Sequence, residues 1–178
     1  MTGPHGGYRK DRSRDLDEGE LDKAMLTERE RQEILEEAAR YPRPQGAAID
    51  AMKLLQRSRG WISNETLEEL GKLLQMTPAE LDGVATFYNL IFRKPVGRHV
   101  ILVCTSVSCW LMRYVDLLHH LRLRLGIELG ETTADGRFTL LPIACLGDCD
   151  HAPAMMVDGR QYGNLTPERV DAILREYE

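Results

Sequence analysis

The chain has 178 residues, of which 43% are hydrophobic and 29% charged, a composition that is typical of a folded protein and excludes disorder throughout. Its formal net charge is −5 with no basic stripe, so nucleic acid is not an expected partner. Because no apolar run approaches the ~18 residues of a membrane span and the first residues resemble no signal peptide, we expect a cytoplasmic chain with no direct membrane span.

The N-terminal half is predicted to be a charged tail followed by a helical bundle. From residue 1 to 26, 11 residues are charged, which predicts a flexible tail. Residues 27–94 carry four helix signals, and the first helix should end near Arg40, before two prolines. The second is expected from about Gln45 to Ser58. Capping residues and terminators mark these helices at Thr27, Glu30, Gly60, Ser63, Thr77, Pro78 and Glu80.

The C-terminal half alternates strand and helix patterns, which predicts an α/β domain over residues 98–178. Short β-branched or apolar runs predict strands at 99–104, 138–143 and 154–157. Helices are expected from about 110 to 125 and from the Thr166 cap to Tyr177, with a tight turn at Asp158 and Gly159.

Four cysteines fall in this half as two pairs, Cys104-x4-Cys109 and Cys145-x3-Cys149, with 35 residues between the pairs. The first pair falls where one predicted strand ends and the second pair follows another, so both belong to strand ends whose loops can converge on one ion or cluster. Gly147 can adopt a positive φ, which would turn backbone N–H groups toward the sulfurs. Trp110, beside Cys109, suits either shielding of such a site from water or packing in the core.

Several roles for these cysteines compete. Two disulfides would suit an oxidising compartment, which the sequence does not indicate, and a dithiol enzyme would need the absent Cys-x-x-Cys. Inert buried thiols would have to fall by chance into two tight pairs. Metal binding is therefore favoured, and the long spacings favour an iron–sulfur cluster over structural zinc without excluding zinc.

The charges around the second cysteine pair indicate the direction of redox tuning. No Lys or Arg occurs from residue 138 to 159, whereas Asp148 and Asp150 flank Cys149. Nearby negative charge disfavours adding an electron, so we expect a low reduction potential for a cluster at this place.

The cysteine motifs also resemble a known family. Asp135-Gly136-Arg137-Phe138-Thr139, then five residues and Cys145-Leu146-Gly147-Asp148-Cys149, is similar to the signature of the 24 kDa subunit of respiratory complex I. In bacteria this family is the E subunit of NADH:quinone oxidoreductase. Further matches cover the chain from about Tyr41 to the C-terminus, namely Ala85-Thr86-Phe87-Tyr88, Pro95-Val96-Gly97, Ala152-Pro153 and Leu165-Thr166-Pro167-Glu168.

The resemblance implies a thioredoxin-like [2Fe-2S] ferredoxin domain behind a helical bundle, with Cys104, Cys109, Cys145 and Cys149 as the four cluster ligands. It implies an electron-transfer subunit of an enzyme, NADH dehydrogenase, with no catalytic residue or substrate-binding site of its own. FMN and NADH would lie on the partner subunit in the peripheral arm, on the cytoplasmic face of the inner membrane. The implied role of the cluster is electron buffering or tuning beside the FMN.

Three alternatives remain open from the sequence. The same module serves NAD-linked hydrogenases and formate dehydrogenases, so the parent complex could be one of those. A four-cysteine zinc interaction module without redox activity, or a thiol–disulfide enzyme, would belong to a different class of protein.

Overall fold

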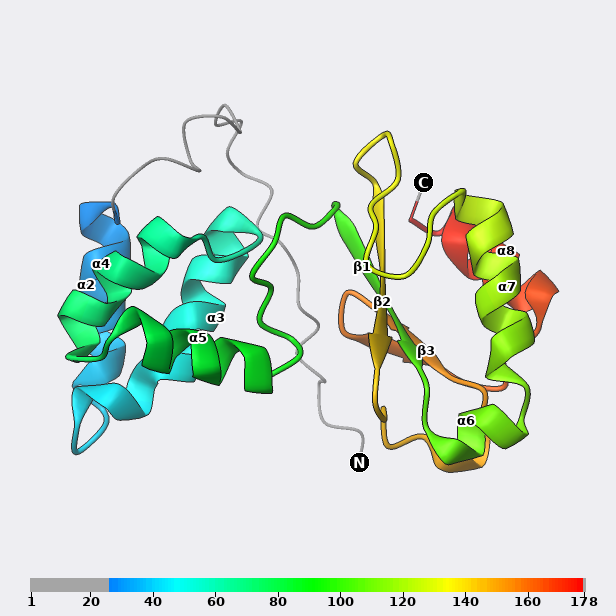
Figure 1. Cartoon of the computed structure of the whole chain (residues 1–178), viewed down its shortest axis with the longest axis horizontal. Helices are drawn as coiled ribbons and strands as arrows, with labels where there is room; N and C mark the ends of the chain where they lie inside the picture. Colours follow the sequence, from blue (N-terminus) through cyan, green and yellow to red (C-terminus); the bar gives the residue numbers. More distant parts are fainter. Residues whose placement is uncertain (1–25, 178) are drawn as a thin grey trace. The chain divides into compact units, whose positions relative to one another are not determined.

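The computed structural model describes residues 26–177. The described chain divides into two compact units between Pro95 and Val96 (Figure 1). Residues 1–25 of the predicted tail lie outside the described residues. Leu26, however, is only 5% exposed and belongs to the core of the first unit, so its assignment to a tail was wrong. Within residues 26–177, the helices are too short or too polar to cross a bilayer.

The first unit is a helical bundle in which the predicted capping motifs are present. Thr27 and Thr77 each accept a hydrogen bond from the N–H three residues later, while Glu30 and Glu80 reach back to the capping N–H. The second predicted helix begins instead with a 3₁₀ turn, because Pro44 starts it, and Gly60 ends it with φ 86°. The elements are α2 (Glu28–Ala38), η1 (Pro44–Ala47), α3 (Ala48–Arg59), α4 (Asn64–Leu74) and α5 (Pro78–Phe87).

The bundle is held by an apolar core and by one ion pair that is nearly excluded from water. The fully buried side chains of the core include Ile34, Met52, Leu55, Leu70 and Leu81. At its edge the guanidinium of Arg59 binds both carboxylate oxygens of Glu30, at 2.7 and 2.9 Å. Their side chains are 5% and 10% exposed, so this pair links α2 to α3 in a poorly solvated place.

The second unit is a four-stranded sheet with helices, in the order β2-β1-β3-β4. β1 and β2 run parallel, and the other two pairings are antiparallel. All six residues of β1 are buried, as expected of an apolar central strand. The elements are β1 (His99–Cys104), α6 (Val107–Leu111), α7 (Tyr114–Leu125), β2 (Phe138–Ile143), η2 (Cys149–His151), β3 (Met155–Val157), β4 (Arg160–Tyr162) and α8 (Pro167–Arg175).

Two sequence predictions in this unit were wrong in detail. The helix predicted from about residue 110 begins earlier and is divided into α6 and α7, because Arg113 adopts a left-handed conformation with φ 63°. The strand β4 was not predicted. It forms because the correctly predicted turn at Asp158 and Gly159 folds the chain back along β3 as a hairpin.

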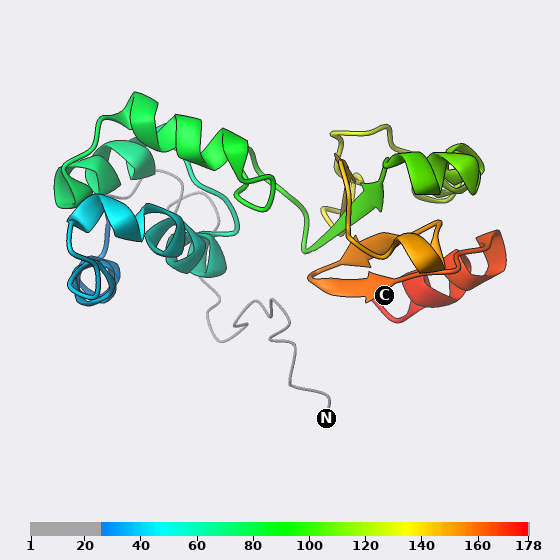
Figure 2. The same cartoon turned by 90° about the horizontal axis from the view of Figure 1, so that it is seen from below.

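Helices α7 and α8 lie beside one another on one face of the sheet (Figures 1 and 2). Their apolar sides meet alternate residues of the central strands, since successive side chains of a strand point to opposite faces. This core contains Ile101, Val103, Leu121, Leu140, Met155, Val157, Val170 and Ile173. The unit thus provides a rigid sheet, from whose strand ends the cysteine-bearing loops depart.

Candidate metal centre

The sheet brings the two cysteine pairs to one edge. Because β1 and β2 are parallel and Cys104 is paired with Ile143, the carboxyl ends of the two strands lie side by side. Cys104 is the last residue of β1, and Cys145 follows β2 after a single intervening residue. Cys109 lies in α6 directly after the first strand, and Cys149 begins η2. The predicted positions at strand ends are therefore confirmed.

The four thiols are free, and their exposure differs between the pairs. Cys104 and Cys109 are 2% and 1% exposed, whereas Cys145 and Cys149 are exposed. One side of the site is accordingly dry and the other is accessible to water in this chain. A group held by all four sulfurs would be surrounded by two different dielectric environments.

Hydrogen bonds favour the thiolate form of Cys104. Burial alone would raise the pKa of its thiol, but hydrogen bonding to Ser106 and to the backbone N–H groups of Ser106 and Leu146 outweighs burial and lowers that pKa. The Ser106 Oγ lies 3.4 Å from the Cys104 Sγ. The pKa of Cys109 is raised by its burial and by the neighbouring Cys104. Because the pKa of Cys104 is lowered and that of Cys109 is raised, Cys104 is the stronger candidate for the anion.

The loop that carries the second pair has the backbone geometry expected from its glycine. Gly147 has φ 77°, and its N–H donates to the Cys145 Sγ at 3.3 Å. The unpredicted strand β4 holds the same loop, since the side-chain amide of Gln161 donates to the carbonyl of Leu146 at 2.6 Å. The N–H of Asn164 donates to the carbonyl of His151, which ties down the other end of the loop.

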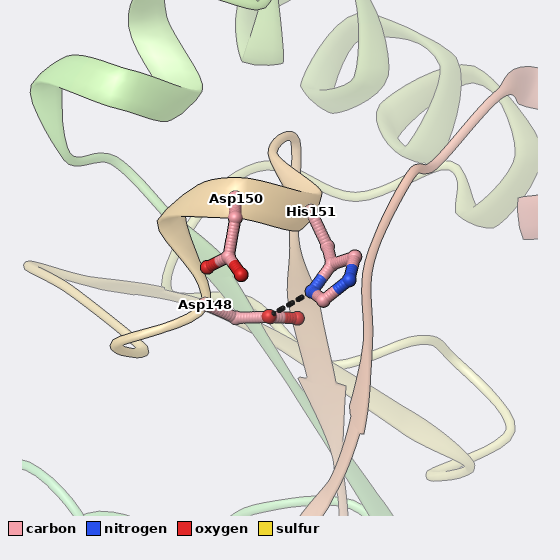
Figure 3. Close-up of side chains that lie close together, drawn as sticks. All are labelled: Asp148, Asp150 and His151. Atoms are coloured by element: carbon pink, nitrogen blue, oxygen red, sulfur yellow. Dashed lines mark hydrogen bonds and ion pairs between the residues drawn. The ribbon is translucent and has the colours of Figure 1, made fainter.

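Asp148, Asp150 and His151 lie together beside Cys149 (Figure 3). The His151 Nδ1 lies 2.6 Å from a carboxylate oxygen of Asp148. This hydrogen bond and the charges of both aspartates raise the pKa of His151. The two carboxylates place negative charge next to the exposed cysteine pair, as the sequence predicted.

The donor set fits an iron–sulfur cluster better than a single ion. Soft thiolates suit both zinc and iron–sulfur clusters. Around one tetrahedral ion with bonds of about 2.3 Å, the sulfurs would lie roughly 3.8 Å apart. Among the described residues, no three cysteine sulfurs lie within 4.8 Å of one another. Two cysteine pairs, each short in sequence, suit a two-iron cluster, in which each iron takes two protein ligands.

Comparison with known families agrees with this donor set. Residues 34–178 match the family of thioredoxin-like [2Fe-2S] ferredoxins. The chain belongs to this family. The resemblance found in the cysteine motifs is thereby confirmed, as is the expected combination of a thioredoxin-like ferredoxin domain with helices.

Relatives of this ferredoxin include named subunits of respiratory enzymes. The chain is 44% identical over 158 residues to the E subunit of NADH-quinone oxidoreductase from Pseudomonas aeruginosa. The match covers 89% of this chain and 95% of the relative. The chain is 43% identical over 152 residues to the same subunit of Escherichia coli K12, covering 85% and 92%. Among solved structures, an NAD+-reducing [NiFe]-hydrogenase in the H2-reduced state is similar, with a TM-score of 0.63 and 28% identity. That match covers 74% of this chain and 22% of the hydrogenase chain.

The sequence left two roles open for Trp110, and it gave no indication of two other contacts around the ferredoxin site. Trp110 is 60% exposed, so it does not pack in the core. The contacts of Ser106 with Cys104 and of Gln161 with Leu146 were missed. A serine directly before a helix is an ordinary capping signal and gives no indication that its hydroxyl faces a sulfur. The contact of Gln161 depends on β4, which was not predicted.

Proposed function

We propose that this chain is the electron-transfer subunit of an NADH:quinone oxidoreductase, and that it holds one [2Fe-2S] cluster with Cys104, Cys109, Cys145 and Cys149. The observation that carries the proposal is the convergence of two free cysteine pairs at one sheet edge, in a chain that matches NADH-quinone oxidoreductase subunits over nearly their whole length. When bound, such a cluster takes up and releases single electrons.

The chain's own residues would hold this group and set its surroundings. Cys104 and Cys109 bind from the dry side, while Cys145 and Cys149 bind from the side open to water. The N–H of Gly147 donates to one sulfur, and Asp148 supplies negative charge nearby. A hydrogen bond to a cluster sulfur raises the reduction potential of the cluster, and a nearby carboxylate lowers it. Gly147 and Asp148 therefore act on the reduction potential in opposite directions. The chain needs no catalytic residue for this role.

We further propose that the electron partner is the subunit that binds FMN and NADH in the same complex, with the cluster acting as an electron buffer or tuning centre beside the FMN. Exposed apolar side chains around Cys109 support a protein partner, since contiguous apolar surface commonly marks an interface. They are Val107, Trp110, Leu111 and Met112, each more than half exposed. The expected location is peripheral, on the cytoplasmic face of the inner membrane.

Low-temperature EPR of the purified full chain, before and after dithionite reduction, tests the cluster assignment. A rhombic S = 1/2 signal that appears only on reduction, together with iron and labile sulfide in the sample, is the expected result. Cys104→Ser and Cys149→Ser should each lose the normal signal. Zinc in place of iron and sulfide, with no signal in either state, would instead identify a structural zinc module and end the electron-transfer proposal.

A hydrogenase or formate dehydrogenase subunit is the second candidate, favoured by the structural similarity to the NAD+-reducing hydrogenase. The similarity to the quinone-linked enzyme is stronger. This chain covers 95% of the Pseudomonas aeruginosa subunit with 44% identity, whereas it covers 22% of the hydrogenase chain with 28% identity. The two candidates are distinguished by the reaction that the native complex containing this chain catalyses. NADH-driven quinone reduction supports the first candidate, whereas NAD+ reduction driven by hydrogen or formate supports the second.

We also propose that residues 27–94 and 98–178 are separate domains. The division of the described chain at Pro95 and Val96 supports this organisation. After any cleavage within residues 1–25, limited proteolysis of the full chain should next cut between the domains, within residues 93–98, and leave two resistant fragments. Early cleavage inside α3 or β1 would contradict the proposed boundary.

A further inference from the structure

Ser106 occupies a position where a serine ordinarily caps a helix. It is the residue before α6, with the extended backbone of an N-cap at φ −65° and ψ 164°. A serine at this position normally accepts a hydrogen bond from a free N–H of the first turn. Here its side chain makes no such bond. The hydroxyl is therefore available for a different contact.

That contact is with the sulfur of a candidate cluster ligand. The Ser106 Oγ lies 3.4 Å from the Cys104 Sγ, within hydrogen-bonding range for sulfur. Cys104 is only 2% exposed, so water does not compete effectively for the sulfur, and a hydrogen bond is electrostatically stronger in such surroundings. A metal-bound thiolate carries no proton, which leaves the hydroxyl as the donor and the sulfur as the acceptor.

We propose that Ser106 is a positioning residue that raises the reduction potential of the cluster through a hydrogen bond to the Cys104 sulfur, an inference that rests on the proposed function. Taking up one electron adds negative charge to the cluster and its sulfurs, without any bond being formed or broken in the protein. An O–H donor stabilises the reduced form more than the oxidised form, so its removal makes reduction less favourable. Ser106 thereby offsets part of the effect of Asp148 and Asp150.

The neighbouring Thr105 provides a matched control. Its hydroxyl donates to the carbonyl of Ile143 at 3.2 Å, rather than to a sulfur. Thr105→Val therefore removes one hydroxyl directly beside Cys104 without removing a donor to the cluster ligand. Ser106→Thr keeps the hydroxyl, whereas Ser106→Ala and Ser106→Gly both remove it, and glycine is itself acceptable at an N-cap.

The test is an EPR-monitored redox titration of the purified full chain with each substitution, alongside iron and sulfide analysis. At a fixed potential, Ser106→Ala and Ser106→Gly should lower the ratio of reduced to oxidised cluster about fivefold, the effect of one ordinary hydrogen bond. For a one-electron couple at 59 mV per tenfold change, this is about 40 mV toward negative potential. Ser106→Thr and Thr105→Val should keep the wild-type ratio, with equal iron and sulfide in all samples.

Three results would overturn this inference while leaving the proposed function intact. They are a wild-type potential in both Ser106→Ala and Ser106→Gly, failure of Ser106→Thr to restore the potential, and an equal shift in Thr105→Val. Loss of the cluster in Ser106→Ala and Ser106→Gly but not in Ser106→Thr would assign Ser106 to cluster retention and would also overturn the tuning role. Absence of iron and sulfide from the wild-type chain would overturn the proposed function itself, and this inference with it.

Discussion

Replacing Glu30 by glutamine should destabilise the helical unit strongly at neutral pH. The carboxylate receives hydrogen bonds from Arg59, from the Ser58 hydroxyl at 2.9 Å and from the Thr27 N–H at 2.9 Å. Burial opposes its ionisation, but these groups outweigh burial and lower the pKa of Glu30 from 4.5 to about 2. At 1.36 kcal/mol per pKa unit, this difference corresponds to about 3 kcal/mol of folding stability.

The sign of the pH dependence follows from the lowered pKa. Stability from the ionised carboxylate is fully present above pH 4.5 and is lost as the pH falls through about 2. At pH 3, roughly 1 kcal/mol of it is retained. The substitution also leaves the Arg59 charge poorly compensated, so Glu30→Gln should cost about 3–5 kcal/mol at pH 7 and about 2 kcal/mol less at pH 3.

Urea unfolding followed by far-UV circular dichroism at both pH values measures this difference. Glu36→Gln is the matched control, because Glu36 is exposed on the same helix and its carboxylate accepts a hydrogen bond from Gln32, which is also exposed. The control should change the free energy of unfolding by less than about 0.5 kcal/mol. If Glu30→Gln costs no more than this control, or if its cost is the same at both pH values, the reasoning about the buried ion pair is refuted.

Other substitutions test further parts of the fold. Thr77→Ala removes the capping hydroxyl of α5 and should cost about 1 kcal/mol in urea unfolding, whereas the non-capping Thr86→Ala should cost less. Leu121→Ala empties a fully buried position between α7 and the sheet and should cost about 2–5 kcal/mol, while the 70% exposed Leu123 should tolerate alanine. Deleting residues 1–25 should leave iron and sulfide per chain unchanged. A loss of both would show that the segment helps to retain the cluster.

The elements that could be predicted from the sequence are those specified by local chemistry. The bounds of β1 match because a short run rich in β-branched residues, preceded by Gly97, favours a buried strand. The helices at Thr27 and Thr77 begin as predicted because capping boxes act within four residues. The break at Arg113 was missed, since arginine carries no preference for a left-handed conformation. That conformation lies in the short connection between α6 and α7, where the sequence carries no terminator such as glycine.

At the candidate site too, features set by the local sequence could be predicted, whereas features set by packing could not. The spacing of the cysteines in the sequence was sufficient to group them into two pairs and to place them at strand ends. The glycine at position 147 was sufficient to predict a positive φ there. Which sulfurs are buried could not be predicted, because burial depends on how the loops fold over the sheet edge. The contact of Ser106 was hidden for another reason. The helix was predicted to begin at about residue 110, whereas α6 begins at Val107, so the sequence indicated neither the place of Ser106 before a helix nor its hydroxyl beside the Cys104 sulfur.

The parallel pairing of β1 with β2 also orders events during synthesis of the chain. Cys109 and Cys145 are 36 positions apart, so a ribosome adding about 5–20 residues per second needs about 2–7 s to pass from one to the other. During that interval the first two thiols have emerged without the strand that positions the second pair beside them. Loading of iron should therefore follow formation of the sheet, in contrast to zinc fingers, where the metal drives folding.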